Sequence, residues 1–199
     1  VRGGNRGTVL RPSAGGGANW MGAGVDPVSG IIYIPSSDSI TAPIMVESDP
    51  LQSTLTYRRI SNSGLRGPQG LPILKPPYAT ITAIDMNSGD IVWQVPNGDR
   101  FPRAENHPAL EGIDLPPMGG GGRNPILVTP TLLVHAQNYS DGALLVARDK
   151  ATGAELASIP LPAAARAAPM SYEYEGRQYI VVAVLTEAAP QLIAYALPN

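Results

Sequence analysis

Residues 83–93 read Ala-Ile-Asp-Met-Asn-Ser-Gly-Asp-Ile-Val-Trp, and this stretch decides the fold class. An Asp followed four residues later by a Gly, between two apolar segments, is typical of a β-hairpin turn. The Asp side chain accepts hydrogen bonds from nearby backbone N–H groups, and the Gly supplies the positive φ that closes the turn. The pattern Asp-x-x-Ser/Thr-Gly also begins at Asp149, and a matching turn begins at Asp26. Three such hairpins, each inside a unit of several strands, predict radial repetition of small sheets.

The segments around these turns are short and rich in β-branched and aromatic residues, and helical periodicity is nearly absent. This length and composition favour strands over helices. The predicted strands are 31–35, 79–86, 90–95, 126–136, 144–148, 177–185 and 191–197. Two stretches, 36–77 and 96–123, are predicted to be long surface loops, which in a compact domain are usually functional or flexible.

The composition agrees with a folded protein that has many turns. Hydrophobic residues make up 43% and charged residues 15%, which excludes wholesale disorder, and the 22 Gly and 21 Pro indicate frequent turns. The net charge of -2 and the scattered Lys and Arg argue against a nucleic-acid partner. No apolar run approaches the roughly 18 residues of a membrane span. Without cysteine there is no disulfide framework, and because Val1–Leu10 has no Met and no apolar signal core, we expect the interior of a longer protein.

Residues 83–93 resemble the tryptophan-docking motif of the quinoprotein propellers, Ala-x-Asp-x-x-Thr-Gly-x-x-x-Trp, in which the Trp packs between neighbouring blades. The repeat at 147–157 keeps the Asp and the Gly but has Ala157 at the Trp position, and the first repeat keeps only Asp26 and Gly30. The motif therefore predicts that Trp93 is a packing residue rather than a ligand contact.

Three further segments resemble the same family. Residues 15–22 resemble the Gly-rich stretch ending in Asn-Trp that closes on the cofactor, residues 169–182 resemble the last blade, and residues 193–198 resemble the usual C-terminus. Their order and spacing are similar to the C-terminal part of the quinoprotein glucose dehydrogenase group, over nearly all 199 residues. The resemblance implies an all-β chain, with 1–199 forming about three to four four-stranded antiparallel blades of an eight-bladed propeller.

The resemblance also implies a function for the complete protein. It would hold pyrroloquinoline quinone (PQQ) and Ca²⁺ on the propeller axis, oxidise a sugar or alcohol in the periplasm, and pass electrons to a quinone or cytochrome. Membrane attachment through a segment upstream of Val1 stays an alternative. The family's catalytic Asp and its quinone-contacting Lys lie upstream of the Asn-Trp stretch, so we expect no catalytic residue and no metal ligand here. The partner would be the missing N-terminal blades, and the chain alone would be inactive.

The candidate cofactor-binding residues are Gly17, Asn19 and Trp20. A flat quinone with a polar rim needs an apolar surface and fixed hydrogen-bond donors, and glycine allows the backbone to approach it. The structural alternative is a turn residue followed by a core Trp. Asp141 is a candidate substrate residue, because the family has an Asp in the loop before the last docking repeat. The Gly-Gly-His of the glucose-oxidising members has no counterpart, since no His follows His135, which puts the sugar specificity in doubt.

The remaining motifs favour structural roles. Residues 119–122, Gly-Gly-Gly-Gly, lack the Lys-Ser/Thr of a phosphate loop and are predicted to form a flexible loop. His107 and His135 are too few for a zinc site without cysteine. Two other functions stay open. One is a non-catalytic propeller scaffold for protein binding, which would have no reason to keep the Asn-Trp stretch, and the other is an incomplete gene product without activity.

Overall fold

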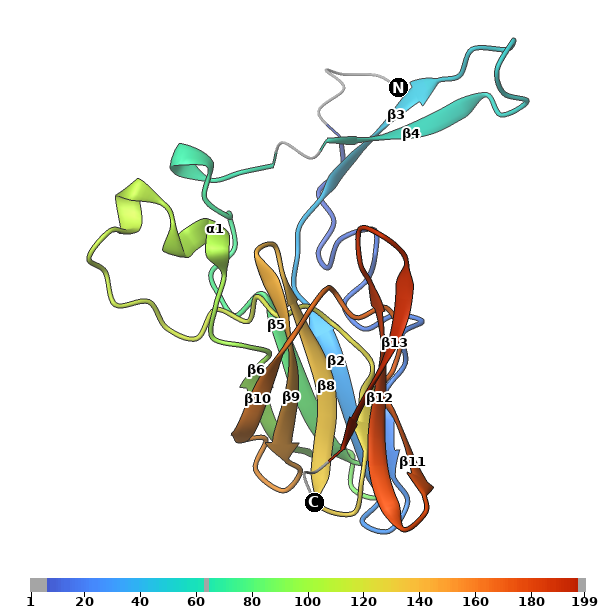
Figure 1. The fold of residues 1–199 in the computed structure, drawn as a ribbon. Coiled ribbons are helices and arrows are strands. Elements are labelled where there is room, and N and C mark those ends of the chain that lie inside the picture. The colour runs from blue at the N-terminus through green and yellow to red at the C-terminus, as the bar shows by residue number, and fades with distance from the viewer. Residues whose placement is uncertain (1–6, 63–64, 197–199) are drawn as a thin grey trace. The chain divides into compact units, whose positions relative to one another are not determined.

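The computed structural model describes residues 7–62 and 65–196, which form two units. The smaller unit comprises 7–17 with 38–75, and the larger comprises 18–37 with 76–196. Strands dominate both units (Figure 1). The described helices are the single turn α1 (Pro102–Glu105) and the 3₁₀ turns Pro68–Gly70 and Pro108–Leu110. The predicted all-β class is confirmed, and none of the described helices is long and apolar enough to cross a membrane.

The larger unit contains three antiparallel sheets. The first has the order β1-β2-β5-β6 and the second the order β10-β9-β8-β7, while the third has the order β11-β12-β13. The first sheet consists of β1 (Gly24–Asp26), β2 (Ile31–Ser37), β5 (Ala79–Asp85) and β6 (Ile91–Pro96). The second consists of β7 (Ile126–Val128), β8 (Leu132–Tyr139), β9 (Gly142–Asp149) and β10 (Glu155–Leu161). The third consists of β11 (Met170–Tyr174), β12 (Arg177–Leu185) and β13 (Pro190–Ala196).

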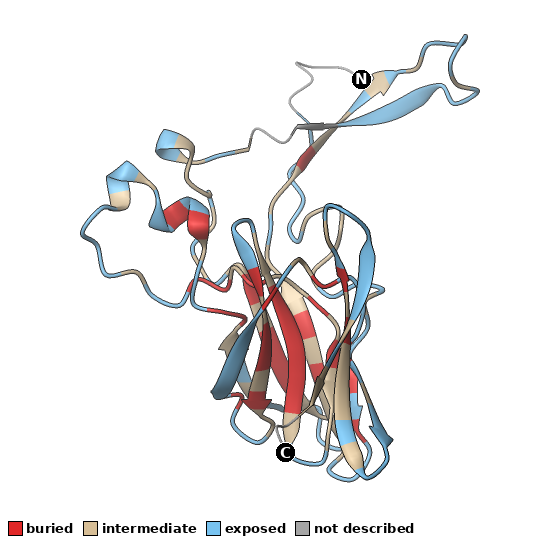
Figure 2. Cartoon of the chain, viewed as in Figure 1, coloured by how far each residue is buried: buried red, intermediate tan, exposed pale blue. Residues whose placement is uncertain are grey.

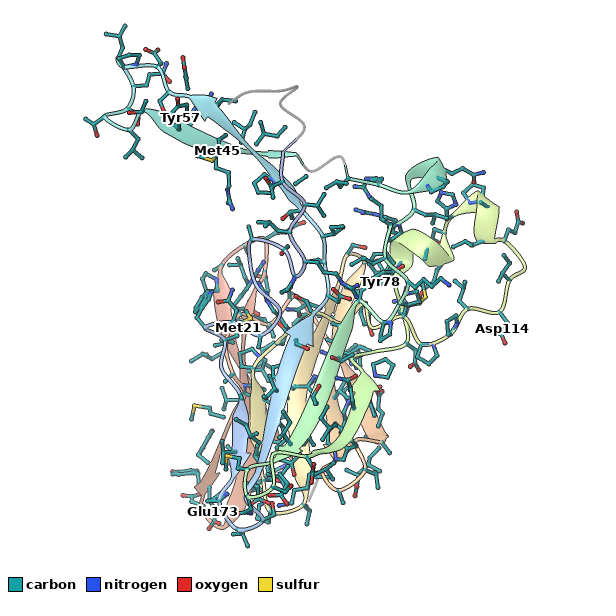
Figure 3. All side chains as sticks on the ribbon, turned by 180° about the vertical axis from the view of Figure 1, so that it is seen from behind. Met21, Met45, Tyr57, Tyr78, Asp114 and Glu173 are labelled. Carbon is teal, nitrogen blue, oxygen red and sulfur yellow. The ribbon has the colours of Figure 1, made fainter. Side chains whose placement is uncertain are left out.

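The smaller unit corrects the prediction of an uninterrupted loop over 36–77. It contains a hairpin of β3 (Ala42–Glu47) and β4 (Tyr57–Asn62), inserted between β2 and β5. Figure 3 labels Met45 and Tyr57 on its two strands. Within the smaller unit, the N-terminal segment pairs with the residues that lead into this hairpin, since Leu10 bridges Thr41 and Arg11 forms an ion pair with Asp38.

The predicted strand 126–136 is also wrong as a single element. A turn at 129–131 divides it into β7 and β8, which pair with each other. Thr129 closes this turn, because its Oγ1 accepts a hydrogen bond from the Leu132 backbone N–H at 2.9 Å. Pro130 has no N–H to donate to a ladder, which favours a turn at this position.

The three Asp turns have the predicted hydrogen bonds. Asp26, Asp85 and Asp149 each accept a bond from a backbone N–H two residues on, at 3.1, 2.8 and 3.0 Å. Each turn ends in a Gly with a φ between 72° and 80°. Their assignment to three separate units is wrong, however. The Asp26 turn joins β1 to β2 and the Asp85 turn joins β5 to β6, so the first two turns belong to one sheet.

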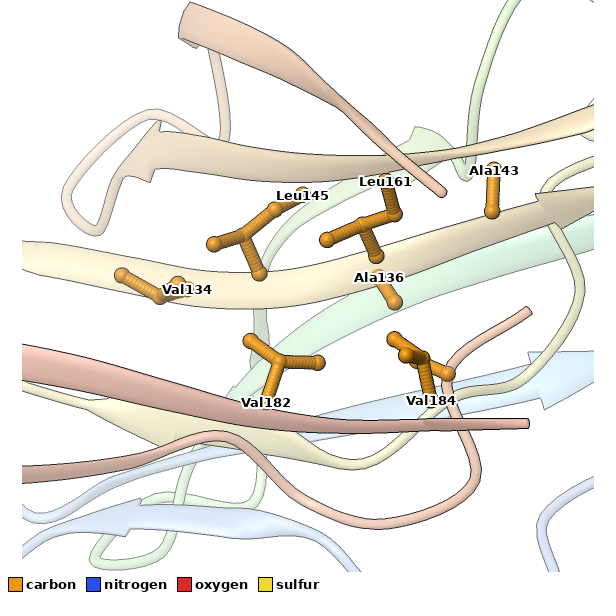
Figure 4. Packing of buried hydrophobic residues seen from close by; sticks show 8 residues of the cluster. Val134, Ala136, Ala143, Leu145, Leu161, Val182 and Val184 are labelled. Carbon is orange, nitrogen blue, oxygen red and sulfur yellow. The ribbon is translucent and has the colours of Figure 1, made fainter. Parts of the chain in front are cut away.

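The core lies between consecutive sheets, with the second sheet in the middle (Figure 2). One cluster joins the first sheet to the second, and it consists of Tyr33, Ile81, Ala83, Ile126 and Leu133. The other joins the second sheet to the third. Figure 4 shows its side chains from β8 and β9 facing Val182 and Val184 of β12. This face-to-face packing of small sheets is the arrangement of neighbouring propeller blades.

Trp93 docks between the first two sheets, as the motif predicts. Its indole N–H donates to the Lys150 carbonyl at 3.2 Å, and its ring lies 5.7 Å from that of Tyr33. A Cβ added to Gly153 would lie 2.8 Å from the Trp93 ring, so the indole rests directly on the β9–β10 turn. Lys150 also donates to the buried Asp26 at 2.6 Å. The turns of adjacent sheets are therefore joined by one ring and one ion pair.

Candidate functional site

The connections of the larger unit differ in length at the two ends of its sheets. The turns β1–β2, β5–β6, β7–β8, β9–β10 and β11–β12 are short and lie at one end, the turn end. The opposite end, the loop end, carries residues 18–23, the β6–β7 connection 97–125 and the β10–β11 connection 162–169 (Figure 1). Binding residues of rigid scaffolds concentrate in such connections, so the loop end is the candidate site.

The glycine run at the loop end is tightly packed, and the prediction of a flexible loop at 119–122 is wrong. The backbone N–H groups of residues 118–121 donate to the carbonyls of residues 97–100, at 2.8–2.9 Å. An added Cβ would lie 2.3 Å from the Ala79 oxygen at Gly119 and 2.1 Å from the Arg100 oxygen at Gly120. Only glycine permits this approach of two backbones. The glycine run therefore closes the base of the 97–125 connection. The outer part of this connection, around Asp114, extends away from the sheets (Figure 3).

Asn19 and Trp20 precede β1 at the loop end and form one tight turn. The Asn19 side-chain oxygen accepts a hydrogen bond from the Trp20 backbone N–H at 2.7 Å, and the Asn19 carbonyl accepts one from Gly22 at 2.9 Å. The Trp20 side chain is 87% exposed. The alternative of a core tryptophan is therefore wrong, and the turn presents a large aromatic surface to solvent.

Gly17 belongs to the smaller unit, whereas Asn19 and Trp20 belong to the larger one. The backbone before Gly17 turns at Ser13, whose carbonyl accepts from the Gly16 N–H at 2.7 Å. Gly16 has a φ of 73°, which L-residues with a side chain rarely adopt. Gly16 therefore closes a turn within the smaller unit, directly before Gly17.

Asp141 lies in the β8–β9 turn at the loop end. Arg100 donates to both of its carboxylate oxygens, at 2.7 and 3.4 Å, and also to Glu105 at 3.1 Å. These bonds keep the pKa of Asp141 below its usual value, with the hydrogen bond from Arg100 as the largest cause. Arg100 also lies 5.3 Å from the centre of the Tyr139 ring. Asp141 is thus an exposed, ionised carboxylate in an ion-pair cluster with Arg100 and Glu105.

A buried polar network that the sequence did not predict runs through the second sheet on its side toward the first. Arg148 donates to His135 at 3.1 Å and to Glu155 at 3.1 Å, and Gln137 donates to Glu155 at 3.4 Å. Tyr139 then donates to Gln137 at 2.7 Å, which brings the network to the loop end. His135 and Gln137 have side chains that are at most 2% exposed.

Burial sets the protonation states in this network. Desolvation, followed by the charge of Arg148, lowers the pKa of His135 to about 4, so the imidazole is neutral at pH 7. A neutral ring accepts the Arg148 hydrogen bond without charge repulsion. Desolvation also raises the pKa of Tyr139 to about 12, which keeps its phenol protonated as a donor. Among the described residues, no cluster of three or more His, Cys, Asp or Glu could hold a metal ion.

Comparison with known proteins identifies the fold and the family. Residues 3–180 match the PQQ family model described as the glucose/ethanol/alcohol dehydrogenase β-propeller domain. The glycerol dehydrogenase large subunit of Gluconobacter oxydans is 30% identical over 94% of the chain and 29% of that relative. Quinoprotein glucose dehydrogenase A of Acinetobacter calcoaceticus is 26% identical over 97% of the chain and 26% of that relative. The chain thus spans between a quarter and a third of these relatives.

A solved structure agrees at the level of the fold. The quinohemoprotein alcohol dehydrogenase of Comamonas testosteroni superimposes with a TM-score of 0.59 and 22% identity, over 90% of this chain and 24% of that one. One assignment follows from the docked tryptophan, the face-to-face packing of small sheets and the family match over most of the sequence. The chain belongs to the family of PQQ-dependent dehydrogenases and forms part of their β-propeller domain.

Proposed function

We propose that this chain supplies one side of the PQQ pocket in a larger periplasmic dehydrogenase that oxidises a sugar or an alcohol. The observation that carries the proposal is the turn at the loop end, which holds Asn19 in a fixed conformation beside an 87% exposed indole. An aromatic face and a positioned amide suit a flat ligand with a polar rim.

The chemistry is divided between the cofactor and protein groups. When bound, PQQ would supply an electron-accepting quinone for the hydride of the hydroxyl-bearing carbon, and a protein base would take the hydroxyl proton. Within the described part of this chain, Asp141 is ionised but already paired with Arg100, so we assign it to substrate contact and not to the base. The base, and the ligands of a Ca²⁺ ion, would come from upstream blades. The electron acceptor would be a quinone or a cytochrome.

Two features support the view that further blades complete the protein. The chain spans 29% or less of the compared relatives. The third sheet also presents an apolar outer face that no described sheet covers. On it lie Met170, Tyr174 and Leu192, which are 53%, 61% and 78% exposed. Burial of such a face against a neighbouring blade is the usual way in which a propeller protects its sheets.

The proposal is tested by titrating PQQ into the longer protein that includes the upstream blades, with binding followed by absorbance and tryptophan fluorescence. Asn19→Ala should weaken PQQ binding about tenfold to hundredfold, because a hydrogen bond to a polar ligand is lost. Val28→Ala is the control, since Val28 is 94% exposed at the turn end. Binding that is equal in both variants would overturn the proposal, and no PQQ binding at all would favour a non-catalytic scaffold.

A further inference from the structure

The joint between the first two sheets contains a space that is filled by the indole ring of Trp93. Trp93 on β6 pairs with Ala83 on β5, immediately before a bulge in the register. Its ring fills the space beside Tyr33 and over Gly153. Two aromatic rings therefore fill this joint.

The second sheet repeats the same backbone arrangement. Ala157 on β10 pairs with Ala147 on β9, and a bulge again separates this pair from the next, Glu155 with Arg148. Because Ile31 pairs with Asp85 and Leu132 pairs with Asp149, the position of Tyr33 in the first sheet corresponds to Val134 in the second. Both rings of the first joint are thus replaced in the second joint, by the small side chains Ala157 and Val134.

A cavity occupies the place of the missing rings. It has a volume of about 170 Å³ and lies between the second and third sheets. Leu132, Val134, Ala147 and Ala157 line it on one side, and Ile180 and Tyr195 line it on the other. The lining is almost entirely apolar. The cavity is open to solvent on one side, because Ala157 and Ile159 of its lining are exposed.

We propose that this cavity binds a small, uncharged aromatic molecule with one ring or two fused rings. An enclosed apolar cavity of about 150 Å³ is known to bind benzene, and the similar volume here, open on one side, suits a molecule between benzene and indole. The lining offers no ionic partner, and a charged ligand would lose its hydration without compensation. The register equivalence with Trp93 identifies the shape that the joint accommodates. This site lies on the joint between sheets, away from the loop end, and it does not depend on PQQ binding.

Indole is the probe, because it is the side chain of Trp93 without its backbone. Binding to the 199-residue chain is measured by ligand-observed NMR and by the melting temperature. At indole concentrations tenfold above its Kd, the melting temperature should rise by about 3 °C. Ala157→Trp should fill the cavity, raise the melting temperature without ligand and abolish the indole effect. Leu156→Trp is the matched control, since Leu156 is 59% exposed on the same strand, and indole binding should persist.

Several outcomes would overturn the proposal. They are no binding of indole to the unsubstituted chain, an equal indole effect in Ala157→Trp, or loss of the effect in Leu156→Trp. If Ala157→Trp does not fold, Ala157→Leu tests the same point, because its side chain occupies part of the cavity and should weaken indole binding at least fivefold. Absence of indole binding together with weaker self-association of Ala157→Trp would assign the cavity to a second copy of the chain and refute the ligand site.

Discussion

Replacement of Gly153 by Ala should loosen the joint between the first two sheets. Gly153 ends the β9–β10 turn with a φ of 75°, and an added Cβ would lie between 2.8 and 3.1 Å from three atoms of the Trp93 ring. The Trp93 ring is rigid and packed, so it cannot move aside for the new Cβ as the end of a flexible side chain could. The substitution therefore has two costs, one from the backbone and one from the displaced indole.

The backbone and the indole contributions to the loss of unfolding free energy can be estimated separately. An L-residue in the left-handed region costs about 1–2 kcal/mol. Displacing the ring removes the hydrogen bond from Trp93 to the Lys150 carbonyl, worth about 1 kcal/mol, and part of the packing of a half-buried aromatic side chain. We therefore expect Gly153→Ala to lower the free energy of unfolding by about 3–4 kcal/mol.

The chain contains its own control for the backbone cost. Gly89 ends the β5–β6 turn with a φ of 80°, at the position equivalent to Gly153 in another copy of the turn motif. Nothing lies within 4 Å of a Cβ added to Gly89. Gly89→Ala should therefore cost only about 1–2 kcal/mol. In a Trp93→Ala background, where no ring is displaced, Gly153→Ala should fall to the same value, which gives a coupling energy of about 2 kcal/mol.

Urea unfolding followed by circular dichroism measures all four variants. Gly153→Ala should be clearly more destabilising than Gly89→Ala, and this difference should vanish when the Trp93 ring is absent. Equal costs for the two glycines, or a Gly153→Ala cost that does not change in the Trp93→Ala background, would refute the docking of the indole on this turn.

Three further predictions concern the buried network, the ion pair and the open sheet faces. His135 has a lowered pKa of about 4 in the folded state, so the unfolded state binds more protons below pH 6.5. Stability should fall by about 3 kcal/mol between pH 6.5 and pH 4, and urea unfolding of His135→Gln should lack most of this loss. Asp26→Asn should lower the melting temperature more than Asp85→Asn, because only Asp26 also holds Lys150 across the joint. Light scattering should show that the 199-residue chain self-associates through its apolar outer faces, whereas a stable monomer at high concentration would contradict this.

Local turn chemistry was the most predictable part of the fold. The Asp and Gly of each turn satisfy backbone groups within five residues, so Asp85 and Asp149 identify their hairpins without reference to the rest of the chain. The same locality explains the error at Asp26. Its turn looks like the others, but it joins the first two strands of a sheet instead of the last two, and only the long-range pairing of β2 with β5 reveals this.

Two of the strands that the sequence did not predict carry residues that are unfavourable in a strand pattern. Strand β4 contains Arg58 and Arg59 in succession and shows no period of two, whereas β10 contains Pro160, a residue that argues against a central strand. In the candidate site, the Asn19–Trp20 turn was predictable from the family resemblance. The packing of Gly119 and Gly120 was not, because close approach of two backbones depends on residues more than 15 positions apart in the sequence.

Turnover by the chain with and without the upstream blades tests the central claim most directly. The measurement is sugar or alcohol oxidation with added PQQ, Ca²⁺ and an artificial electron acceptor. One side of a pocket leaves the cofactor exposed to water and provides no positioned base, so the 199-residue chain alone should show no measurable oxidation. The longer protein should be active, and Asn19→Ala should lower its rate or its PQQ affinity. Robust turnover by the 199-residue chain alone, or unchanged rate and PQQ affinity in Asn19→Ala of the longer protein, would contradict the account.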